Sequence, residues 1–294
     1  MLKHRSLILC FVFIAAIFSN SLFAQDKKVK WQRHEAKKLD LQLLHSTFVI
    51  NLPTAETLQK GDFLFEISHR FIPTTGSGHN GLYGFDGPVN MRIALGYALT
   101  NRWVVTLGRS NFNDNIDLWT KLKILQIRMD VMPILVSAKF GGAWNTQMPP
   151  EIYDRDKTNK RNFQGFGQLV INTLIAKKLG LGLVPSYVYN SDIRFSDKTK
   201  DTFTLGNYMQ YYVSHMFSLM IEWNPKISGY LNKYNALSFG FELETGGHFF
   251  KVFLTNNYAL NTAQFLSGSD LPVDNNDWRL GFGITRLLKF GHKM

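Results

Sequence analysis

The sequence is short of cysteine and has no long apolar run. Cys10 is the single cysteine among 294 residues, and it lies in an N-terminal apolar stretch. The chain therefore cannot form an internal disulfide or a multi-cysteine metal site. Outside that stretch, no segment approaches the roughly 18 consecutive apolar residues that a transmembrane helix needs. These shortages exclude a disulfide-stapled domain and a helical membrane protein.

The first 24 residues have the layout of a secretory signal peptide. Lys3 and Arg5 form a basic start, Leu7 to Phe18 is apolar, and the segment ends on Ala24. The apolar run is too short to cross about 30 Å of hydrocarbon as a helix. We therefore expect residues 1–24 to be a signal peptide cleaved after Ala24, which predicts an exported protein.

The formal net charge is +11. A basic balance can indicate nucleic acid, an anionic membrane surface or acidic ligands as partners. An exported protein rarely meets nucleic acid, so we expect no nucleic-acid partner. Membrane lipids and acidic ligands remain as possible partners of the basic chain.

From Gly61 onward, apolar and polar residues alternate with a period of two. In one example, Phe63, Phe65 and Ile67 share one face, while Glu66 and Ser68 share the other. About twelve such segments follow one another, and single-chain bacterial barrels have even strand numbers. A closed barrel is the strand structure that can satisfy every backbone group in lipid. The sequence predicts an all-β fold, an antiparallel transmembrane β-barrel over residues 61–294.

The connections between the predicted strands alternate between long and short. Short turns such as Thr100-Asn101 and Lys177-Lys178 alternate with longer loops such as residues 145–162 and 259–276. Outer-membrane barrels have short periplasmic turns and long external loops, so the first strand should start in the periplasm. A soluble periplasmic β-sandwich is the rival fold, because alternation alone does not exclude it.

Residues 25–60 differ from the rest of the chain. Lys27 to Lys38 is polar and basic, and the apolar stretch Leu39 to Leu58 is interrupted by Pro53. We expect residues 25–60 to form a periplasmic N-terminal segment that packs at the mouth of the barrel.

Aromatic residues fall near the predicted strand ends, where amphipathic rings prefer the membrane interface. We expect them to form two aromatic girdles. The predicted girdle residues are Trp103, Trp144, Tyr189, Phe217, Trp223 and Trp278.

Charged residues at inward positions form two predicted walls of the lumen. Parity places Arg92, Lys121, Lys123 and Lys139 on a basic wall, and Glu222, Glu242 and Glu244 on an acidic wall. Facing walls across a wet lumen would set up a transverse field that filters polar solutes. The alternative is that these charges pair with one another and close the lumen.

Two stretches of the sequence carry a family resemblance: Phe48 to Thr57 and, most specifically, Ile67, Ser68, His69, Arg70 and Phe71. This resemblance is to a family of membrane-bound β-barrels of unknown function from Bacteroidota-type bacteria. It continues through the glycine-rich loop from Gly76 to Gly87 and covers about residues 45–294. The resemblance implies a barrel in the bacterial outer membrane, and it implies no catalytic residue.

Signals for chemistry are weak. His34-Glu35 begins like a zinc-protease helix, but Lys38 occupies the position of the second histidine. Ser68 and His69 are adjacent on one strand, so they point to opposite faces and cannot form a catalytic dyad. The charged loop Glu151 to Arg161 could hold calcium or a lipopolysaccharide phosphate, but a solvated external loop with balanced charge explains it better. We expect no catalytic residue, no metal and no cofactor.

Three functions remain compatible with this fold. The first is a narrow channel or transporter for small polar solutes with a charged lumen. The second is a non-conducting structural or binding barrel whose external loops meet a protein partner or lipopolysaccharide. The third, which we disfavour, is a membrane-embedded hydrolase. In each case outer-membrane lipids and lipopolysaccharide are expected partners.

Overall fold

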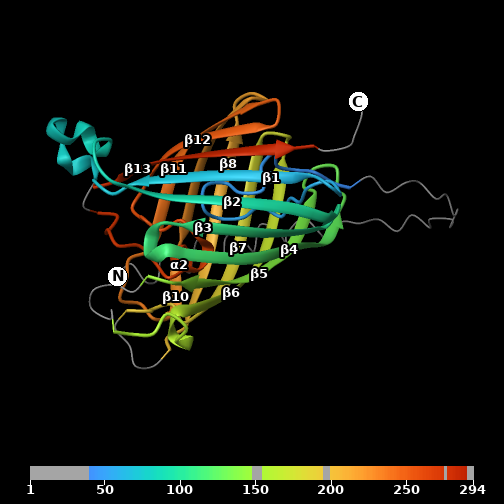
Figure 1. Ribbon diagram of the computed structural model, residues 1–294. Coiled ribbons are helices and arrows are strands. Elements are labelled where there is room, and N and C mark those ends of the chain that lie inside the picture. Colours follow the sequence, from blue (N-terminus) through green and yellow to red (C-terminus); the bar gives the residue numbers. More distant parts are fainter. Residues whose placement is uncertain (1–39, 148–153, 195–198, 275–276, 290–294) are drawn as a thin grey trace, which may run out of the picture. The chain divides into compact units, whose positions relative to one another are not determined.

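The computed structural model of the protein describes residues 40–147, 154–194, 199–274 and 277–289 (Figure 1). The expected signal peptide, and residues 25–39 of the expected periplasmic segment, lie outside these ranges. The chain from Asp40 onward forms one compact unit. None of the described helices is long and apolar enough to cross a membrane.

The described chain consists mostly of β-strands. The strands are β1 (Phe63–Phe71), β2 (Val89–Thr100), β3 (Trp103–Ser110), β4 (Asn115–Ile127), β5 (Ile134–Asn145), β6 (Phe163–Ile175), β7 (Leu179–Tyr189), β8 (Thr202–Tyr212), β9 (Phe217–Asn224), β10 (Lys226–Gly229), β11 (Ala236–Thr245), β12 (His248–Thr255) and β13 (Arg279–Leu288). The short helices are η1 (Thr75–Ser77), η2 (His79–Gly84), η3 (Phe112–Asp114), η5 (Lys160–Asn162) and α2 (Thr262–Leu266).

Twelve of these strands close into one antiparallel barrel. Sequence neighbours pair around the ring, and the first strand, β1, closes it by pairing with the last, β13. The remaining strand, β10, pairs only with the start of β8, at Thr202–Thr204. The predicted twelve-stranded transmembrane barrel is therefore confirmed, and the β-sandwich is excluded.

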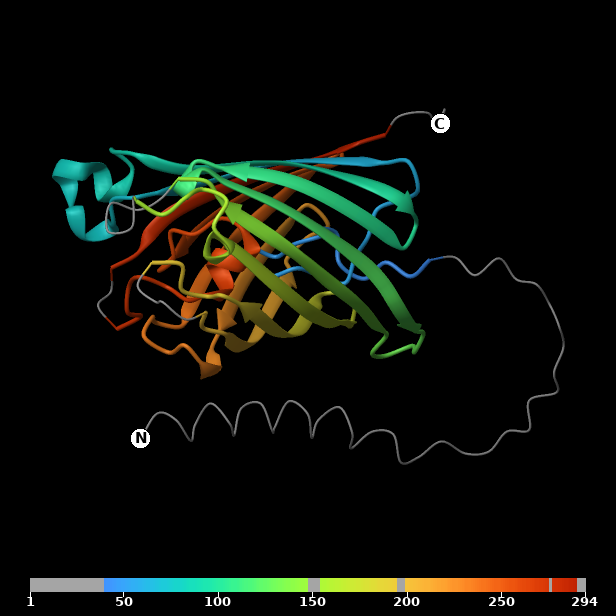
Figure 2. The same ribbon diagram turned by 60° about the horizontal axis from the view of Figure 1, so that its bottom comes forward.

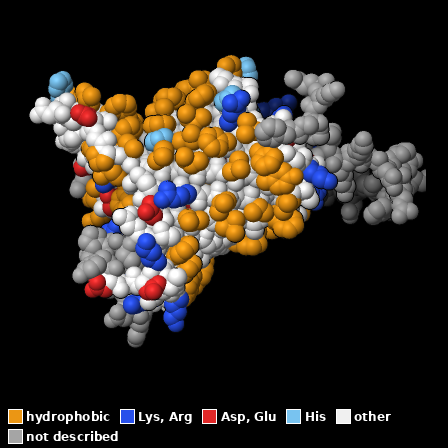
Figure 3. Space-filling view, viewed as in Figure 1, with side chains coloured by type: hydrophobic (Ala, Val, Ile, Leu, Met, Phe, Trp, Pro, Cys, Tyr) orange, Lys and Arg blue, Asp and Glu red, His pale blue; other side chains and the backbone are white. Residues whose placement is uncertain are grey.

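The period of two in the sequence sorts side chains between the lipid and the lumen. On β4, Ile116 and Leu118 are exposed on the outer surface, whereas Asp117, Trp119 and Lys121 are buried inside. In Figure 3, apolar side chains cover most of the strand surface on the face shown, and most of the charged ones lie toward its ends. A barrel that is apolar outside and polar inside matches a lipid exterior.

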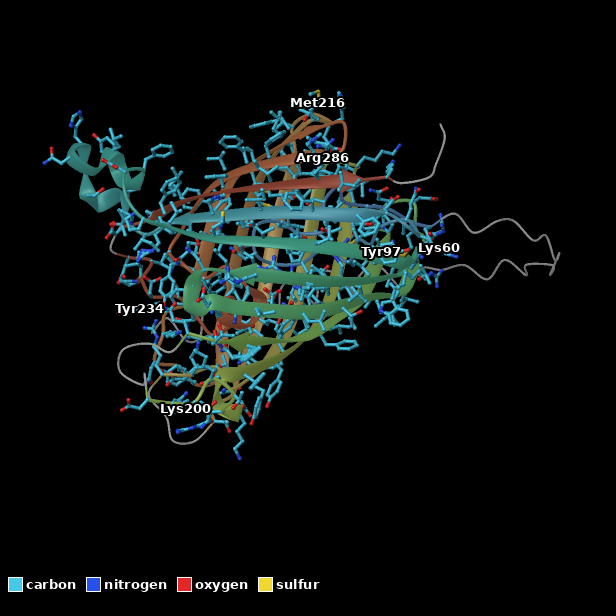
Figure 4. The ribbon with its side chains drawn as sticks, viewed as in Figure 1. Lys60, Tyr97, Lys200, Met216, Tyr234 and Arg286 are labelled. Atoms are coloured by element: carbon cyan, nitrogen blue, oxygen red, sulfur yellow. The ribbon has the colours of Figure 1, made fainter. Side chains whose placement is uncertain are left out.

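The connections differ between the two ends of the barrel. Two-residue turns join β2 to β3 and β11 to β12, and the second uses Gly246 and Gly247, both with positive φ. Positive φ at both central residues is the pattern of a type I′ turn, and glycine adopts it without strain. Long connections lie at the other end, which we call the outer end because external loops are the longer ones. In Figure 4, Lys60 and Tyr97 mark the inner end, and Lys200 and Tyr234 mark the outer end.

Most of residues 40–60 lies inside the barrel, as the blue segment in Figure 2 shows, while Gln59 and Lys60 are exposed at the inner end. We call this segment the lumen hairpin, because Thr54 N–H donates to Thr47 C=O and Val49 N–H donates to Leu52 C=O around its tip. Leu44, Val49 and Leu52 are fully buried. The expectation that this segment packs at the barrel mouth underestimated its depth, because its apolar side chains pack within the barrel.

The loop between β12 and β13 fills the lumen from the outer end. Its helix α2 places Ala263, Phe265 and Leu266 in the same apolar cluster as Leu44 and Val49 of the lumen hairpin. Inward side chains of the wall, including Trp119, Leu135 and Val184, complete this cluster. The described lumen is therefore packed from both ends.

The lipid-facing surface gives a testable prediction. Leu107 lies in the middle of the outward row of β3 and is 56% exposed. Leu107→Arg should lower the free energy of unfolding from bilayers by about 2–4 kcal/mol, because a cation at mid-membrane depth is poorly solvated. Urea titration in lipid vesicles measures this change. Val131→Arg, in the inner turn where Val131 is 76% exposed, is the matched control and should change it little.

Candidate functional site

The candidate site is the lumen, where charged wall residues meet the lumen hairpin. The tip of the hairpin has backbone N–H groups that no strand pairs. Glu222 on β9 accepts hydrogen bonds from the N–H groups of Asn51 and Leu52, each at 2.9 Å, and from that of Ile50 at 3.3 Å. A carboxylate is a strong acceptor for such donors, so one wall residue satisfies the whole turn.

The side chain of Asn51 is held from three strands. Its amide nitrogen donates to Glu222 on β9 and to Ser238 Oγ on β11, the latter at 3.2 Å. Its amide oxygen accepts a hydrogen bond from Arg70 on β1. Arg70 is buried, and its guanidinium carbon lies 4.2 Å from the ring centroid of Phe253. Arg70, which belongs to the stretch Ile67–Phe71 that carries the family resemblance, therefore helps to hold the hairpin tip in place.

The opposite wall binds the carbonyl groups of the hairpin. Lys121 Nζ on β4 donates to the carbonyl oxygens of Thr47 and Thr54, at 3.2 and 3.1 Å. Lys123 Nζ donates to the carbonyl oxygen of Leu41 at 3.2 Å. The basic wall therefore serves backbone acceptors, while Glu222 serves backbone donors.

Glu56 is a carboxylate of the hairpin itself. Its Oε1 accepts hydrogen bonds from the N–H groups of Leu43 and Leu44, at 2.9 and 3.0 Å, and its Oε2 lies 3.9 Å from Lys123 Nζ. Burial raises the pKa of the Glu56 carboxyl, and these donors oppose that rise. Glu56 links the two arms of the hairpin and also ties them to the basic wall.

Two acidic-wall residues have different partners. Glu242 on β11 lies 3.2 Å from Lys251 Nζ on the neighbouring strand, and Lys251 also donates to Ser46 Oγ at 2.9 Å. Glu244, near the inner end, contacts the His45 imidazole of the hairpin and is partly exposed. Both carboxylates therefore act on the hairpin, Glu242 through a lysine and Glu244 directly.

The remaining basic-wall residues, Arg92 and Lys139, do not face an open lumen. Arg92 is paired along the wall, with Asp117 at 2.6 Å and Glu66 at 3.1 Å. Lys139 is fully buried, and among the described residues it has no carboxylate within 4 Å. Its ammonium group lies 4.4 Å from the Trp119 ring and donates to Thr262 Oγ1 of α2 at 2.7 Å.

Lys139 therefore connects the two segments that fill the lumen. Its ammonium group lies 4.7 Å from the ring centroid of Phe48 in the hairpin, and Thr262 ties it to the outer loop. Aromatic faces stabilise a desolvated cation by electrostatic attraction. One buried lysine thus touches both the hairpin and α2.

Two spaces remain between the lumen hairpin and the wall formed by β1, β12 and β13. A cavity of about 260 Å³ lies at the inner end beside His45, Glu244 and Leu287. A cavity of about 50 Å³ lies deeper, beside Asn51, Arg70 and Arg92, and Thr285 borders both. In place of two walls facing across water, the structure has two walls that hold a segment between them.

The six aromatic residues of the predicted girdles lie at strand ends. Trp103 and Phe217 begin β3 and β9 at the inner end, and Trp144, Tyr189, Trp223 and Trp278 lie at or beside the outer ends of strands. None of them is buried. Trp144 Nε1 donates to the carbonyl of Lys157 at 2.9 Å, and Trp103 Nε1 donates to Thr120 Oγ1 at 2.6 Å. Their role at the membrane interface stays a prediction.

Of the other motif residues, Ile67, His69 and Phe71 lie on the outward face, and Ser68 lies on the lumen side. His69 stacks on Phe282 with ring centroids 4.2 Å apart, and Phe71 stacks on Phe85 at 4.9 Å. Ile67 is half-buried on the outward face, and Ser68 borders the deeper cavity. In the part of the chain that the structure describes, no group of three metal-ligating side chains comes together.

Sequence reasoning missed the hairpin contacts and three charged residues that serve them. Arg70 and Lys251 follow inward parity, so the period of two could have added both to the walls. Glu56 has no such signal, because it lies in a segment without regular periodicity. The apolar residues Leu43, Leu44, Val49 and Leu52 before the first strand were the available sign of a buried segment.

The contacts of Glu222 give a second prediction. Ala55 is fully buried, and Ala55→Cys should react slowly with a maleimide in the folded protein. Adding Glu222→Ala should raise the labelling rate at least about tenfold, because each lost charge-assisted hydrogen bond is worth about 1.5–3 kcal/mol. Cys10→Ser in all variants removes the background thiol.

Glu244→Ala is the matched control for this labelling. Its single contact with His45 is partly exposed, and such pairs contribute about 1 kcal/mol or less. The labelling rate should therefore change much less than in Glu222→Ala. Equal rates in the two carboxylate variants would contradict the assignment of Glu222 as the main anchor of the hairpin.

The fold of the barrel is similar to those of several outer membrane proteins whose structures are solved. The barrel is similar to an outer membrane channel from Pseudomonas putida F1 (COG4313; 14% identity, TM-score 0.49, covering 80% of this chain and 98% of that one). It is also similar to the NanC porin (9% identity, TM-score 0.47, covering 78% of this chain and 100% of that one). A third similar structure is the outer membrane protein Omp33 of Acinetobacter baumannii (8% identity, TM-score 0.40, covering 79% of this chain and 99% of that one). No curated protein matches the chain.

The family is given by the sequence of the barrel itself. Residues 44–288 match the family described as "Membrane bound beta barrel domain (DUF5777)", which includes most of the lumen hairpin and all the strands. A closed antiparallel barrel with an apolar exterior is the strand structure of bacterial outer membranes. The chain therefore belongs to this family of membrane-bound β-barrels and is an integral protein of the bacterial outer membrane.

Proposed function

We propose that the protein is a gated channel for small polar solutes, closed by its own lumen hairpin. The observation that carries this proposal is the polarity of the wall behind the hairpin. Lys121, Glu222, Glu242 and Lys251 line it and are buried. A barrel filled only for stability could fill its lumen with apolar side chains of the wall, and would then need neither the hairpin nor the buried charges that hold it. A polar wall is suited to line a water-filled pore once the hairpin has moved out of the lumen.

The energetics favour a channel that is closed at rest. Five apolar side chains of the hairpin are buried, namely Leu43, Leu44, Val49, Leu52 and Ala55. Their burial contributes on the order of 10 kcal/mol, at about 1.5–3 kcal/mol for each large side chain. A two-state equilibrium biased to this extent leaves the open state rare. Frequent opening therefore needs a ligand or a partner that binds the open state better, and openings without one should be rare and brief.

A disulfide between the hairpin and the wall tests the gate. Ala55 N–H donates to Asn172 Oδ1 on β6 at 2.6 Å, so these two positions are close. In planar bilayers, Ala55→Cys/Asn172→Cys in a Cys10→Ser background should be silent when oxidised. After reduction it should show brief openings like those of the parent protein. Each single-cysteine variant is the matched control and should be insensitive to oxidation.

The second candidate function is a non-conducting binding barrel that uses its external loops. The filled lumen favours it, because α2 and the hairpin meet in one apolar cluster. This candidate would be favoured over the channel if neither the reduced double variant nor Glu222→Ala conducts, while Ala55→Cys is labelled fast in the Glu222→Ala background. The hairpin would then leave its site without opening a path for ions. Neither candidate function includes a catalytic step. We further propose that the protein comes from a bacterium of the Bacteroidota type.

A further inference from the structure

A further cavity lies at the outer end of the barrel, on the far side of α2 from the lumen hairpin. It has a volume of about 80 Å³ and is lined by the loops that follow β3, β7, β10 and β12. We call it the outer vestibule and define it by Phe112, Asp192, Arg194, Tyr230, Lys233 and Tyr258. Lys200 and Tyr234, on two of these loops, show its end of the barrel in Figure 4.

Two cations of the outer vestibule, Arg194 and Lys233, form no ion pair in the described chain, although Asp192 and Asp270 lie near enough to Lys233 to raise its pKa. The acids nearby are already engaged: Asp192 Oδ2 lies 4.0 Å from Lys200 Nζ, and Asp270 Oδ2 lies 2.6 Å from Arg279 Nη2. Neither Arg194 nor Lys233 has a carboxylate within 4 Å among the residues that the structure describes.

Arg194 and Lys233 are also close enough to repel each other. Burial lowers the pKa of Lys233, and the positive charge of Arg194 lowers it further. Two like charges that share a partly desolvated site destabilise each other, because the local dielectric is lower than that of water. An anion between them would remove this repulsion and gain charge-assisted hydrogen bonds from both.

The rest of the lining suits a small organic anion. The Arg194 guanidinium carbon lies 5.9 Å from the ring centroid of Phe112. Tyr230 and Tyr258 offer aromatic faces, and Gln264 and Ser267 offer polar groups. A water molecule needs about 10–15 Å³ measured in this way, so the vestibule holds several waters or one small acid group.

We propose that the outer vestibule binds a small anionic solute, carboxylate or phosphate, between Arg194 and Lys233. The site lies on the outer face of the loop whose helix α2 carries Thr262, the partner of Lys139 in the lumen. Binding at this site does not require the barrel to conduct, so it can be tested apart from the channel.

Calorimetric titration of the full chain in detergent at constant ionic strength tests the proposal, with acetate and inorganic phosphate as probes and glucose as the neutral control. The parent protein should bind at least one of the two anions and should not bind glucose. Lys233→Gln and Arg194→Gln should each weaken anion binding at least about tenfold, because each removes a charged donor. Lys233→Arg keeps the charge and should bind within about threefold of the parent.

Lys157→Gln is the matched control, because Lys157 is an exposed cation of another outer loop that does not line the vestibule. Its affinity should equal that of the parent. Heat-modifiable mobility on gels verifies that each variant folds. The proposal is overturned if neither anion binds the parent, or if Lys157→Gln weakens binding as much as Lys233→Gln does. Equal affinity in Lys233→Gln, Arg194→Gln and the parent overturns it as well.

Discussion

The backbone of an irregular segment enclosed in a barrel has N–H and C=O groups that need partners. In the lumen hairpin these partners come from long side chains of the wall. Glu222 accepts from three N–H groups at the tip, and Lys121 donates to two carbonyl oxygens on the opposite side. Leaving such groups buried and unpaired costs about 1–3 kcal/mol each. The apolar packing of the hairpin, the shape of the remaining cavities and the proposed gate all depend on these bonds.

The separation of positive and negative wall residues also fixes the orientation of the hairpin. Its carbonyl groups face lysines, and its N–H groups face carboxylates. A hairpin turned around would bring carbonyl oxygens against Glu222 and N–H groups against Lys121, and like partial charges would repel. The two walls therefore select one orientation, as charge patterns do at protein interfaces.

The sequence predicts the wall of the barrel well and its contents poorly. The period of two decides which side chains face lipid, so strands such as β4 and the inward position of Trp119 follow directly. The hairpin contacts join residues about 170 positions apart, as in Leu52 with Glu222, and no local pattern signals such pairs. Arg92 was placed on a basic wall, yet its partner Asp117 lies two strands away along the ring, and parity gives no pairing.

The ring is closed by β1 and β13, the first and last strands of the chain, and the lumen hairpin precedes β1. The hairpin is therefore synthesised before any of the wall that encloses it. Residues 40–60 must already be in place when the two terminal strands meet, or must thread into a finished cylinder afterwards. In the first order of assembly, the hairpin would be a template around which Lys121, Glu222 and Lys251 gather. A chain lacking it would have to close around the α2 loop and water, without the partners of these wall residues.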